Sequence, residues 1–393
     1  MSHIGRHLIT TLFGESHGPA VGVVLHGLPA GEKVDACALS RFLERRRPGG
    51  FLVTRRNEPD TPEFLSGLVD GVTCGSPLSA VIWNKQARSA DYDAFRRTPR
   101  PSHADLVALL RHGPDVDIRG GGAFSGRLTA GLVVAGGVAL QLLERRGIRV
   151  GAHLKRIGTV VDVPFHPTGA NRDLIRAARE NALGCGMPMC SAKAAVDAAR
   201  LVEDVRSRGD SLGAEVECVV EGVPAGLGDA LFGGIDADLA RMIFSIPAVK
   251  GFQMGEGFGA VEMPGSQHND PHRRTVPEEE RRFGTPLLPL TNHAGGIVGG
   301  ITTGASILFS CAFKPAASIS VPQETASIGV PEMTTLVVKG RHDPVVGIRA
   351  VPVVEAAAAL VVLDALLGDT ERWNALPVFH EAEDAGHPED RRA

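Results

Sequence analysis

Apolar residues recur along the chain in two patterns, and each pattern predicts a type of secondary structure. Alternating or β-branched runs predict four strands, at 21–25, 79–83, 215–220 and 305–313. Alanine-rich segments predict four helices, at 127–146, 171–182, 191–208 and 353–367. The last of these helices is apolar on nearly every side, so we expect it to be buried. Because strands and helices do not alternate strictly, the pattern favours mixed α+β layers over a doubly wound sheet.

A faint internal repeat links two distant parts of the chain. Residues 20–31 and 215–226 are both apolar β-like runs that end in Gly-x-Pro-Ala-Gly. A helical pattern that begins with Asp-Ala follows each run, at 35–45 and 236–244. The offset is far too long for a solenoid, and it fits two related β–turn–helix halves of one pseudo-symmetric fold. Coincidence of a common turn sequence is the alternative explanation.

Two segments differ in composition from the rest. Residues 264–290 hold five prolines and a run of charges, which predicts a long, mobile surface loop suited to act as a lid. From Asp369 the sequence turns polar, so residues 369–393 are predicted to form a disordered tail. We therefore expect one folded domain over residues 1–368.

The composition restricts the class of protein. Hydrophobic residues make up 43% of the 393 residues and aromatic residues only 5%, so the core must be mainly aliphatic. A net charge of −4 predicts no attraction to nucleic acid or to an anionic membrane. The lack of any run of about 18 uncharged apolar residues predicts no membrane span. With six cysteines outside zinc-type spacing and no signal-peptide pattern, we expect a reduced, cytoplasmic protein without a metal site.

The first candidate for chemistry is the segment 13–18, which reads Phe-Gly-Glu-Ser-His-Gly. Its flanking glycines would allow a turn to present Ser16 and His17 to a ligand. Imidazole exchanges protons near neutral pH. A lone histidine is nevertheless more often structural, so this motif by itself leaves both interpretations open.

The second candidate is His103, within the stiff turn 99–105 that leads into a predicted helix. Ser102 could cap that helix, and Asp105 would lie in its first turn. Capping therefore accounts for Ser102 and Asp105 without any chemistry, but it does not account for His103.

Two glycine-rich segments could bring backbone close to a ligand. Residues 119–129 place Ser125 and Arg127 at a helix start, where N–H groups can bind phosphate. This segment is neither a Walker A loop nor a dinucleotide fingerprint. Residues 292–304 hold five glycines beside an amide and an imidazole, which suits either a flat ligand or tight packing between layers.

Cationic side chains gather in three places. Six arginines lie between residues 41 and 56, which would suit a polyanionic substrate, although a solvated surface explains any single one of them. The segment 314–318 offers one lysine and one serine hydroxyl. Residues 341–343 put arginine, histidine and aspartate in consecutive positions after a glycine, which favours a functional loop.

These motifs, taken together and in this order, resemble the chorismate synthase family over about residues 3–365. The matching stretches are FGESHG, RRRPGG, NEPD, RPSHAD, RGGG..SGR, GVPAGLG, SIPAVKG, NHAGGI.GGI, KPAASI and GRHDP. Each motif alone is a weak signal, whereas ten in the same order are highly specific. The resemblance implies a β-α-β sandwich that assembles as a homotetramer.

The implied activity is a flavin-dependent anti-1,4-elimination of phosphate from 5-enolpyruvylshikimate 3-phosphate, giving chorismate for the biosynthesis of aromatic amino acids. An enzyme of this kind is a carbon–oxygen lyase, and reduced FMN is its implied cofactor. NADPH is a candidate reductant, because some relatives reduce their own flavin. A small phosphorylated molecule is therefore the expected partner.

The resemblance also implies roles for single residues. His17 matches an acid that protonates the leaving phosphate, and His103 matches a histidine near N1 of the flavin. Asp343 matches an acid that assists proton removal through N5 of the flavin. Ser16 and Ser125 match hydroxyls near flavin and substrate. The residues implied in substrate binding are Arg46, Arg127 and Arg341. The residues implied in FMN binding are Ala123, Phe124, Ser125, Pro247, Ala248, Asn292, His293, Gly299, Lys314, Pro315, Ala316, Ala317, Ser318 and Arg341.

Three departures from the family pattern bear on the site. Phe51-Leu52 stands where many members have an arginine, and Ala123-Phe124 stands where many have Arg-Ser. Ala316-Ala317 replaces two hydroxyl residues. Losing two hydrogen bonds of about 1 kcal/mol each would weaken FMN binding tens-fold unless backbone groups compensate.

Two other functions remain open from the residues alone. One is an NADPH-dependent flavin reductase on the same scaffold, although the chain has no dinucleotide fingerprint. The other is a catalytically silent paralogue. The presence of His17, His103, Arg127, Arg341 and Asp343 together argues against a silent scaffold.

Overall fold

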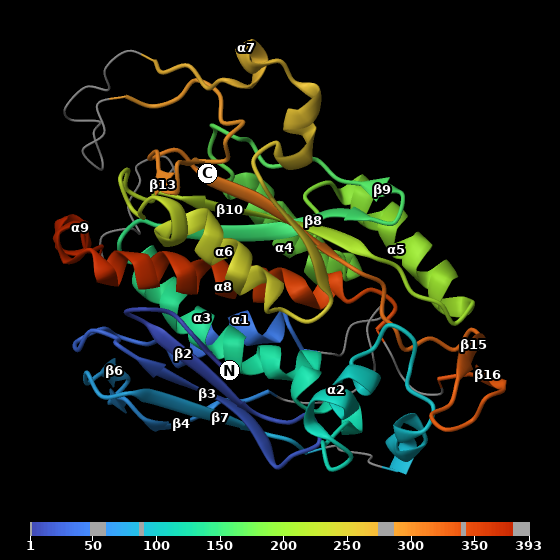
Figure 1. Ribbon diagram of the computed structural model, residues 1–393. Helices are drawn as coiled ribbons and strands as arrows, with labels where there is room; N and C mark the ends of the chain where they lie inside the picture. The colour runs from blue at the N-terminus through green and yellow to red at the C-terminus, as the bar shows by residue number, and fades with distance from the viewer. Residues whose placement is uncertain (1, 48–59, 86–89, 274–286, 339–342, 380–393) are drawn as a thin grey trace.

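The computed structural model describes residues 2–47, 60–85, 90–273, 287–338 and 343–379. Two five-stranded antiparallel sheets enclose a layer of helices (Figure 1). The first sheet contains, in spatial order, β1 (His3–Ile4), β2 (Ile9–Gly14), β3 (Ala20–His26), β7 (Leu78–Trp83) and β4 (Glu63–Ser66). The second contains β11 (Val249–Met254), β14 (Ile307–Phe313), β10 (Ala214–Glu221), β8 (Arg149–Ile157) and β9 (Val160–Val161).

Alternation along the strands explains which face of the first sheet is buried. Val21, Val23 and Leu25 on β3 point into the core, whereas Phe13 on β2 and Trp83 on β7 are exposed on the outer face. In the described part of the chain, the outer face of this sheet has no covering helix layer (Figure 1). The first sheet is therefore buried on one side only.

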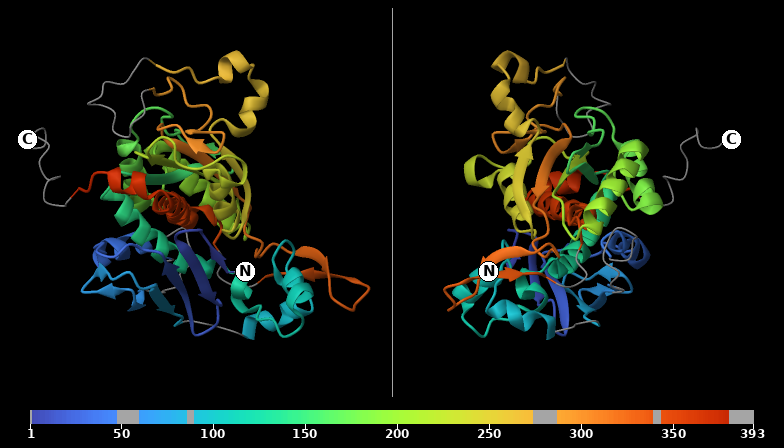
Figure 2. Two further views of the ribbon diagram at one scale, coloured as in Figure 1. Left: turned by 60° about the vertical axis from the view of Figure 1, so that its left-hand side comes forward. Right: turned by 90° about the vertical axis from the view of Figure 1, so that its right-hand side faces the viewer.

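The helix layer is formed mainly by α3 (Thr129–Glu144) and α8 (Gly347–Gly368), with α1 (Ala36–Glu44) and α6 (Ile235–Phe244) beside them. Figure 2 shows α8 nearly end-on between the two sheets. Gly136 allows α3 and α8 to approach closely, because a Cβ there would lie 2.3 Å from Cα of Ala356. Both long helices are almost wholly buried, as their apolar composition requires.

Both long helices are also apolar enough, by length and composition, to cross a membrane. Most of the apolar stretch of each is buried against the rest of the protein, 78% for 126–144 and 83% for 347–368. Their hydrophobicity is therefore accounted for by the core between the sheets.

The second sheet, unlike the first, is buried on both faces. Helices α4 (Arg172–Cys185) and α5 (Ala192–Ser207) pack on the side away from the helix layer. Ile175 of α4 contacts β8, where a Cβ at Gly151 would lie 2.3 Å from it. The remaining strands are β5 (Leu68–Val69), β6 (Val72–Thr73), β12 (Ile297–Val298), β13 (Ile301–Thr302), β15 (Gln323–Ala326) and β16 (Met333–Leu336). The remaining helices are α2 (Asp105–His112), α7 (Gly265–His268) and α9 (Thr370–Ala375), with 3₁₀ turns at Ala90–Arg96, Arg119–Phe124, Gly126–Leu128, Leu231–Gly233 and Gly257–Glu262.

The predicted α+β layers are confirmed, and the internal repeat has a structural counterpart. The first copy gives β3 in one sheet followed by α1, and the second gives β10 in the other sheet followed by α6. All four predicted strands and all four predicted helices are present. The helix expected at 353–367 begins earlier, at Gly347, and contains Pro352.

The C-terminal segment differs from the prediction of a tail that is disordered from Asp369. Asp369 caps α9 by accepting a hydrogen bond from the backbone N–H of Arg372. Trp373 is buried, and the guanidinium of Arg146 lies 3.5 Å from the centre of its ring. One aromatic anchor therefore orders the first part of a polar segment. Residues 380–393 lie outside the described residues.

The predicted loop 264–290 is only partly described. Its first part holds the short helix α7, and Asp270 accepts hydrogen bonds from Thr291, His293 and Ala294. Residues 274–286 lie outside the described residues, so lid closure stays a prediction.

Candidate active site

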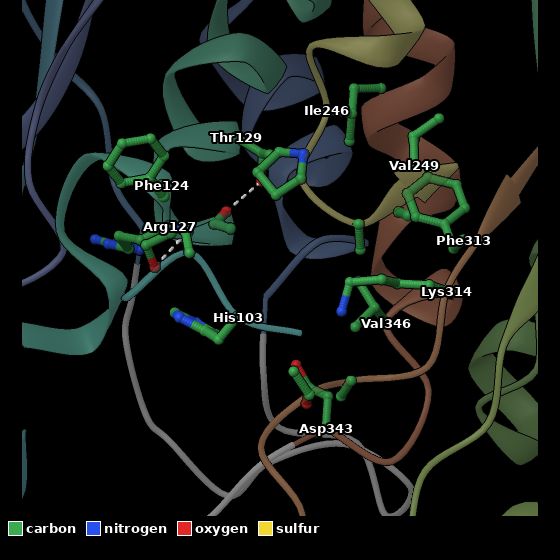
Figure 3. Close-up of a pocket in the computed structure, with 18 of the residues that line it drawn as sticks. His103, Phe124, Arg127, Thr129, Ile246, Val249, Phe313, Lys314, Asp343 and Val346 are labelled. Atoms are coloured by element: carbon green, nitrogen blue, oxygen red, sulfur yellow. Dashed lines mark hydrogen bonds between the residues drawn. The ribbon is translucent and has the colours of Figure 1, made fainter. Parts of the chain in front are cut away.

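A cavity of about 710 Å³ opens where several of the sequence motifs meet. Its wall is built from both halves of the fold, with α3 and the loop before it on one side and β11, β14 and α8 on the other (Figure 3). The segments that contribute are 100–107, 120–129, 244–250, 313–318 and 343–353. A volume of this size is typical of sites that enclose a cofactor or substrate.

The triple glycine of the segment 119–122 lies directly on the FGESHG motif. Gly120, Gly121 and Gly122 all have positive φ. A Cβ at Gly120 would come 2.6 Å from Oγ of Ser16 and 2.7 Å from Nε2 of His17. The backbone N–H of Ser16 donates to the carbonyl of Gly122 over 3.2 Å. Only glycine fits this contact, which explains why the two motifs occur together.

Ser16 lines the cavity, and His17 lies beside it. The ring of His17 meets Tyr92 edge-on, with centroids 5.1 Å apart. Tyr92, the single tyrosine of the chain, is itself on the cavity wall. The structure therefore places both predicted residues at this site.

His103 lies on the cavity wall, as predicted, but its neighbours do not act as the sequence indicated. Ser102 has φ of 58° and Ala104 occupies the N-cap position without a side-chain hydrogen bond. Asp105 is turned inward, where it is 1% exposed. Ser102 is thus no side-chain cap, and Asp105 instead contacts Arg100 and His103.

Arg46 and Arg127, both predicted to bind substrate, share one buried carboxylate. Asp60 accepts from Nη1 of Arg46 over 2.6 Å and from Nη1 of Arg127. Arg46 also donates to Thr129 and to the carbonyl of Gly126. Its role in the structure is to brace the start of α3, which differs from the expected substrate contact. Two guanidiniums on one carboxylate leave a net positive charge at the cavity.

The glycine-rich loop ends at the expected cofactor residues. Ser125 caps the turn before α3 by accepting a hydrogen bond from the backbone N–H of Arg127. Ala123 and Phe124 line the cavity beside Ser125, and Figure 3 shows Phe124 close to Arg127. The three predicted residues of this segment are therefore brought to the site.

The opposite wall carries the other predicted cofactor segments, Pro247-Ala248 and 314–318. Ala248 has φ of 74°, a strained conformation for a residue with a side chain, and its carbonyl accepts from the N–H of Lys314. Burial, and then the charge of Lys250, lower the pKa of Lys314. An anion placed between these two lysines would relieve both effects.

Asp343 lies across the cavity from Arg127, with His103 between them in the view of Figure 3. Its carboxylate pairs with Nη1 of Arg349 over 2.8 Å. Arg349 in turn donates to the backbone carbonyl of Arg46. The predicted residue Arg341 and the departure at Phe51-Leu52 lie outside the described residues.

Three predicted cofactor residues are not brought to the cavity. Asn292 is buried and donates to the carbonyls of Pro167 and Ser306, so it holds two loops together. His293 contacts Asp270 through Nδ1 at 2.9 Å. Gly299 lies in the turn between β12 and β13, and none of the three lines the cavity in the described part of the chain. The glycines at 295, 296 and 300 serve close backbone packing, the alternative that the sequence left open.

A second cluster of titratable groups is buried under α5, away from the cavity wall. Ligand-type atoms of His153, Asp162 and Cys190 lie within 4.8 Å of one another. His153 contacts Asp162 through Nδ1 at 2.9 Å and Glu217 through Nε2 at 3.1 Å. Burial lowers the pKa of His153, but hydrogen bonds to Asp162, Cys190 and Glu217 raise it further, to well above its ordinary value. An imidazolium therefore satisfies the two carboxylates in place of a metal ion.

The fold and the cavity together define an enzyme that acts on a small, anionic substrate and can enclose a second ligand. The family model for chorismate synthase matches residues 8–367. The chain belongs to the chorismate synthase family and is therefore a carbon–oxygen lyase, which confirms the prediction made from the ten motifs.

Individual relatives agree with this assignment. The chorismate synthase of Aeropyrum pernix is 44% identical over 364 residues, covering 93% of this chain and 92% of that protein. That of Thermococcus kodakarensis is 43% identical over 364 residues, with 92% and 97% covered. That of Phocaeicola vulgatus is 43% identical over 361 residues, with 91% and 96% covered. A crystal structure of chorismate synthase superposes with a TM-score of 0.70 at 26% identity and covers 93% of each chain.

Sequence reasoning found the histidines but missed Arg100, Asp105 and Asp60 as parts of the site. Each is buried and charged, and each pairs with a predicted residue. Asp60 belongs to the NEPD motif and Arg100 and Asp105 to RPSHAD. A signal was therefore present, but capping explained Asp105 equally well.

Proposed function

We propose that this protein converts 5-enolpyruvylshikimate 3-phosphate to chorismate by anti-1,4-elimination of phosphate, with reduced FMN as cofactor. The observation that carries the proposal is the convergence of His103, Arg127, Lys314 and Asp343 on one cavity of about 710 Å³ (Figure 3). Membership of the chorismate synthase family supports the reaction. The separate arrangement of cations on two walls supports a site that takes two anionic ligands.

The residues present fit a flavin mononucleotide. Lys314 and Lys250 supply cations on one wall, and Lys314 has a lowered pKa, as expected of a desolvated cation awaiting a phosphate. Pro247-Ala248 and the segment 314–318 offer backbone groups there, and Phe124 offers an apolar surface on the other wall. Bound reduced flavin would supply electron density transiently and receive it back, without net redox change.

The substrate carries a phosphate and two carboxylates, so binding requires positive charge. Arg127 supplies it at the cavity, together with the charge left over where two guanidiniums share Asp60. Because the Asp60 pair is buried, the arginine is held in one orientation before the substrate arrives. Arg341 would add a further cation, on the family resemblance.

Departure of phosphate is easier if a proton is delivered to it, and His17 is suited to deliver it. The edge contact with Tyr92 and the glycine loop hold the ring in place beside Ser16. General acid catalysis of this kind is typically worth about 10²–10⁴-fold. Asp343 and Ser125 on the cavity wall are available to assist removal of the ring proton.

We also propose that the protein works as a homotetramer in a reducing, cytoplasmic environment. Support for assembly comes from large apolar side chains at the surface, with Phe232 92%, Val261 85% and Phe258 80% exposed. All six cysteines, each in the described part of the chain, are free thiols. Light scattering of the purified protein tests the assembly, and a monomer would contradict it.

The experiment that tests the activity is anaerobic turnover of 5-enolpyruvylshikimate 3-phosphate, followed by the absorbance of chorismate. One sample receives dithionite-reduced FMN, one oxidised FMN, one no flavin, and one oxidised FMN with NADPH. We expect product with reduced FMN and none without flavin. Product in the NADPH sample would identify NADPH as a reductant. Tight FMN binding without product would instead favour the flavin reductase.

A further inference from the structure

Asp105 lies at the start of α2 with its carboxylate against the ring of His103. Oδ1 of Asp105 is 2.8 Å from Nδ1 of His103. The same carboxylate binds Arg100 in a bidentate manner, with Nε on Oδ2 and Nη2 on Oδ1, both at 2.7 Å. The backbone N–H of Arg100 adds a third donor at 3.2 Å.

This carboxylate is held as an anion. Its burial raises the pKa of Asp105, but the hydrogen bonds to Arg100 and His103 lower it further, to well below its ordinary value. An anionic oxygen close to Nδ1 favours a proton on that nitrogen. Nη2 of Arg100 is farther from Nδ1, at 3.1 Å, and already donates to Oδ1.

With Nδ1 engaged, the other nitrogen of His103 faces the ligand. A Cβ at Gly121 would lie 3.5 Å from Cε1 and 3.7 Å from Nε2, so this edge of the ring faces the glycine loop at the cavity wall. The side chain is 23% exposed, and Figure 3 shows it on the wall between Arg127 and Asp343. Arg100 is also tied to Ser318 through Nη1 at 3.0 Å, which joins His103 to the other wall.

We propose that Asp105 is a positioning residue that keeps the proton of neutral His103 on Nδ1 and makes Nε2 the atom that exchanges protons in the cavity. A proton taken from the bound ligand goes to Nε2, the resulting imidazolium is offset by Asp105, and return of the proton restores the neutral ring. The identity of that ligand, as flavin or substrate, rests on the proposed function. The tautomer of His103 does not.

A purely structural role for Asp105 is the competing explanation. Arg100 packs over the rings of Tyr92 and Phe95, so Asp105 could serve only to hold Arg100 there. Loss of such a role would lower stability without changing the tautomer of His103. The two explanations therefore differ in a spectroscopic signature.

The test is solid-state ¹⁵N NMR of the full chain labelled at histidine, with the His103 signals identified by their absence in His103→Gln. We expect the neutral ring of the unchanged protein to carry its proton on Nδ1. In Asp105→Asn an amide group replaces one oxygen and donates to Nδ1, so the proton should move to Nε2. Turnover should then fall about tenfold or more in kcat, with a smaller change in KM.

Two further variants complete the test. Asp105→Glu keeps the charge and should retain the proton on Nδ1 and recover part of kcat, and it carries the test if Asp105→Asn does not fold. Asp204→Asn removes an exposed aspartate–arginine pair on α5 and should change neither readout. A proton on Nε2 in the unchanged protein, or an unchanged tautomer and kcat in Asp105→Asn, would overturn the proposal. A correct tautomer without chorismate would contradict the proposed function alone.

Discussion

Gly120 and His17 are in direct contact across the two most distinctive motifs of the chain, and a Cβ at Gly120 would lie 2.7 Å from Nε2 of His17. The same Cβ would collide with Oγ of Ser16 at 2.6 Å. The glycine loop thus fixes where the imidazole lies. Its φ of 60° adds a second reason for glycine at this position.

Gly120→Ala should therefore give a folded protein with impaired turnover. Displacing the His17 ring by a fraction of an ångström is expected to lower kcat about tenfold or more, because catalysis depends on alignment of the reacting groups. The control is Gly184→Ala in α4, where a Cβ meets nothing within 4 Å. Normal kcat in Gly120→Ala, measured with reduced FMN, would remove this contact from the mechanism.

Asp60→Asn should be strongly destabilising. The carboxylate is buried and neutralises part of the charge on Arg46 and Arg127, and removal of one partner from a buried ion pair typically costs about 3–5 kcal/mol. Urea unfolding measures the loss. The matched control is Asp204→Asn, which breaks an exposed pair with Arg208 and should leave the midpoint nearly unchanged. Equal midpoints for the two variants would contradict a structural role for Asp60.

Lys314→Met should weaken FMN binding. A charged hydrogen bond to phosphate is worth about 1.5–3 kcal/mol, which corresponds to about 10- to 100-fold in the dissociation constant. Quenching of flavin fluorescence on titration with protein measures it. Lys193→Met removes an exposed lysine of α5 and serves as control. An unchanged affinity in Lys314→Met would place the flavin phosphate elsewhere.

The buried cluster around His153 predicts a pH dependence of stability with two limbs. The pKa of His153 is raised on folding, so its contribution is complete below the ordinary value of 6.5 and is lost as the pH rises through the folded value. The pKa values of Asp162 and Glu217 are lowered despite their burial, by hydrogen bonds that include His153. Their contributions are complete above the ordinary values of 3.8 and 4.5 and are lost in acid.

His153→Gln should flatten the alkaline limb and destabilise the protein near neutrality, because two buried carboxylates lose their cation. Lys155, which contacts Glu217 at 2.8 Å, compensates for only one of them. Unfolding free energies in slightly acidic and in alkaline buffer, for both proteins, measure the difference. A variant whose stability varies with pH as steeply as the unchanged protein would contradict an imidazolium at this position.

The sequence alone predicted the layers well because burial leaves a periodic record in the chain. The apolar helix at 353–367 and the strand at 215–220 are buried on nearly all sides, and their composition reflects that. Asp369 and Trp373 were misjudged, because a single aromatic anchor leaves no periodic pattern. Local composition therefore underestimates segments held by one long-range contact.

The site was predicted through motifs, and motifs do not reveal which side chains face each other. His103 was correctly placed, but Asp105 next to it looked like a helix cap because its contact with Arg100 depends on an inward turn at Ser102. Asn292 and His293 belong to an equally specific motif, yet they bond to loop backbone and to Asp270. Only the fold separates residues that line a cavity from residues that hold loops together.

The most direct test of the central claim is the stoichiometry of a single anaerobic incubation with limiting reduced FMN. Chorismate, released phosphate and the oxidation state of the flavin are measured together. The proposed elimination predicts equal amounts of chorismate and phosphate, many times in excess of the flavin, with the flavin still reduced at the end. Flavin oxidised in proportion to the substrate consumed, or phosphate released without chorismate, would contradict it.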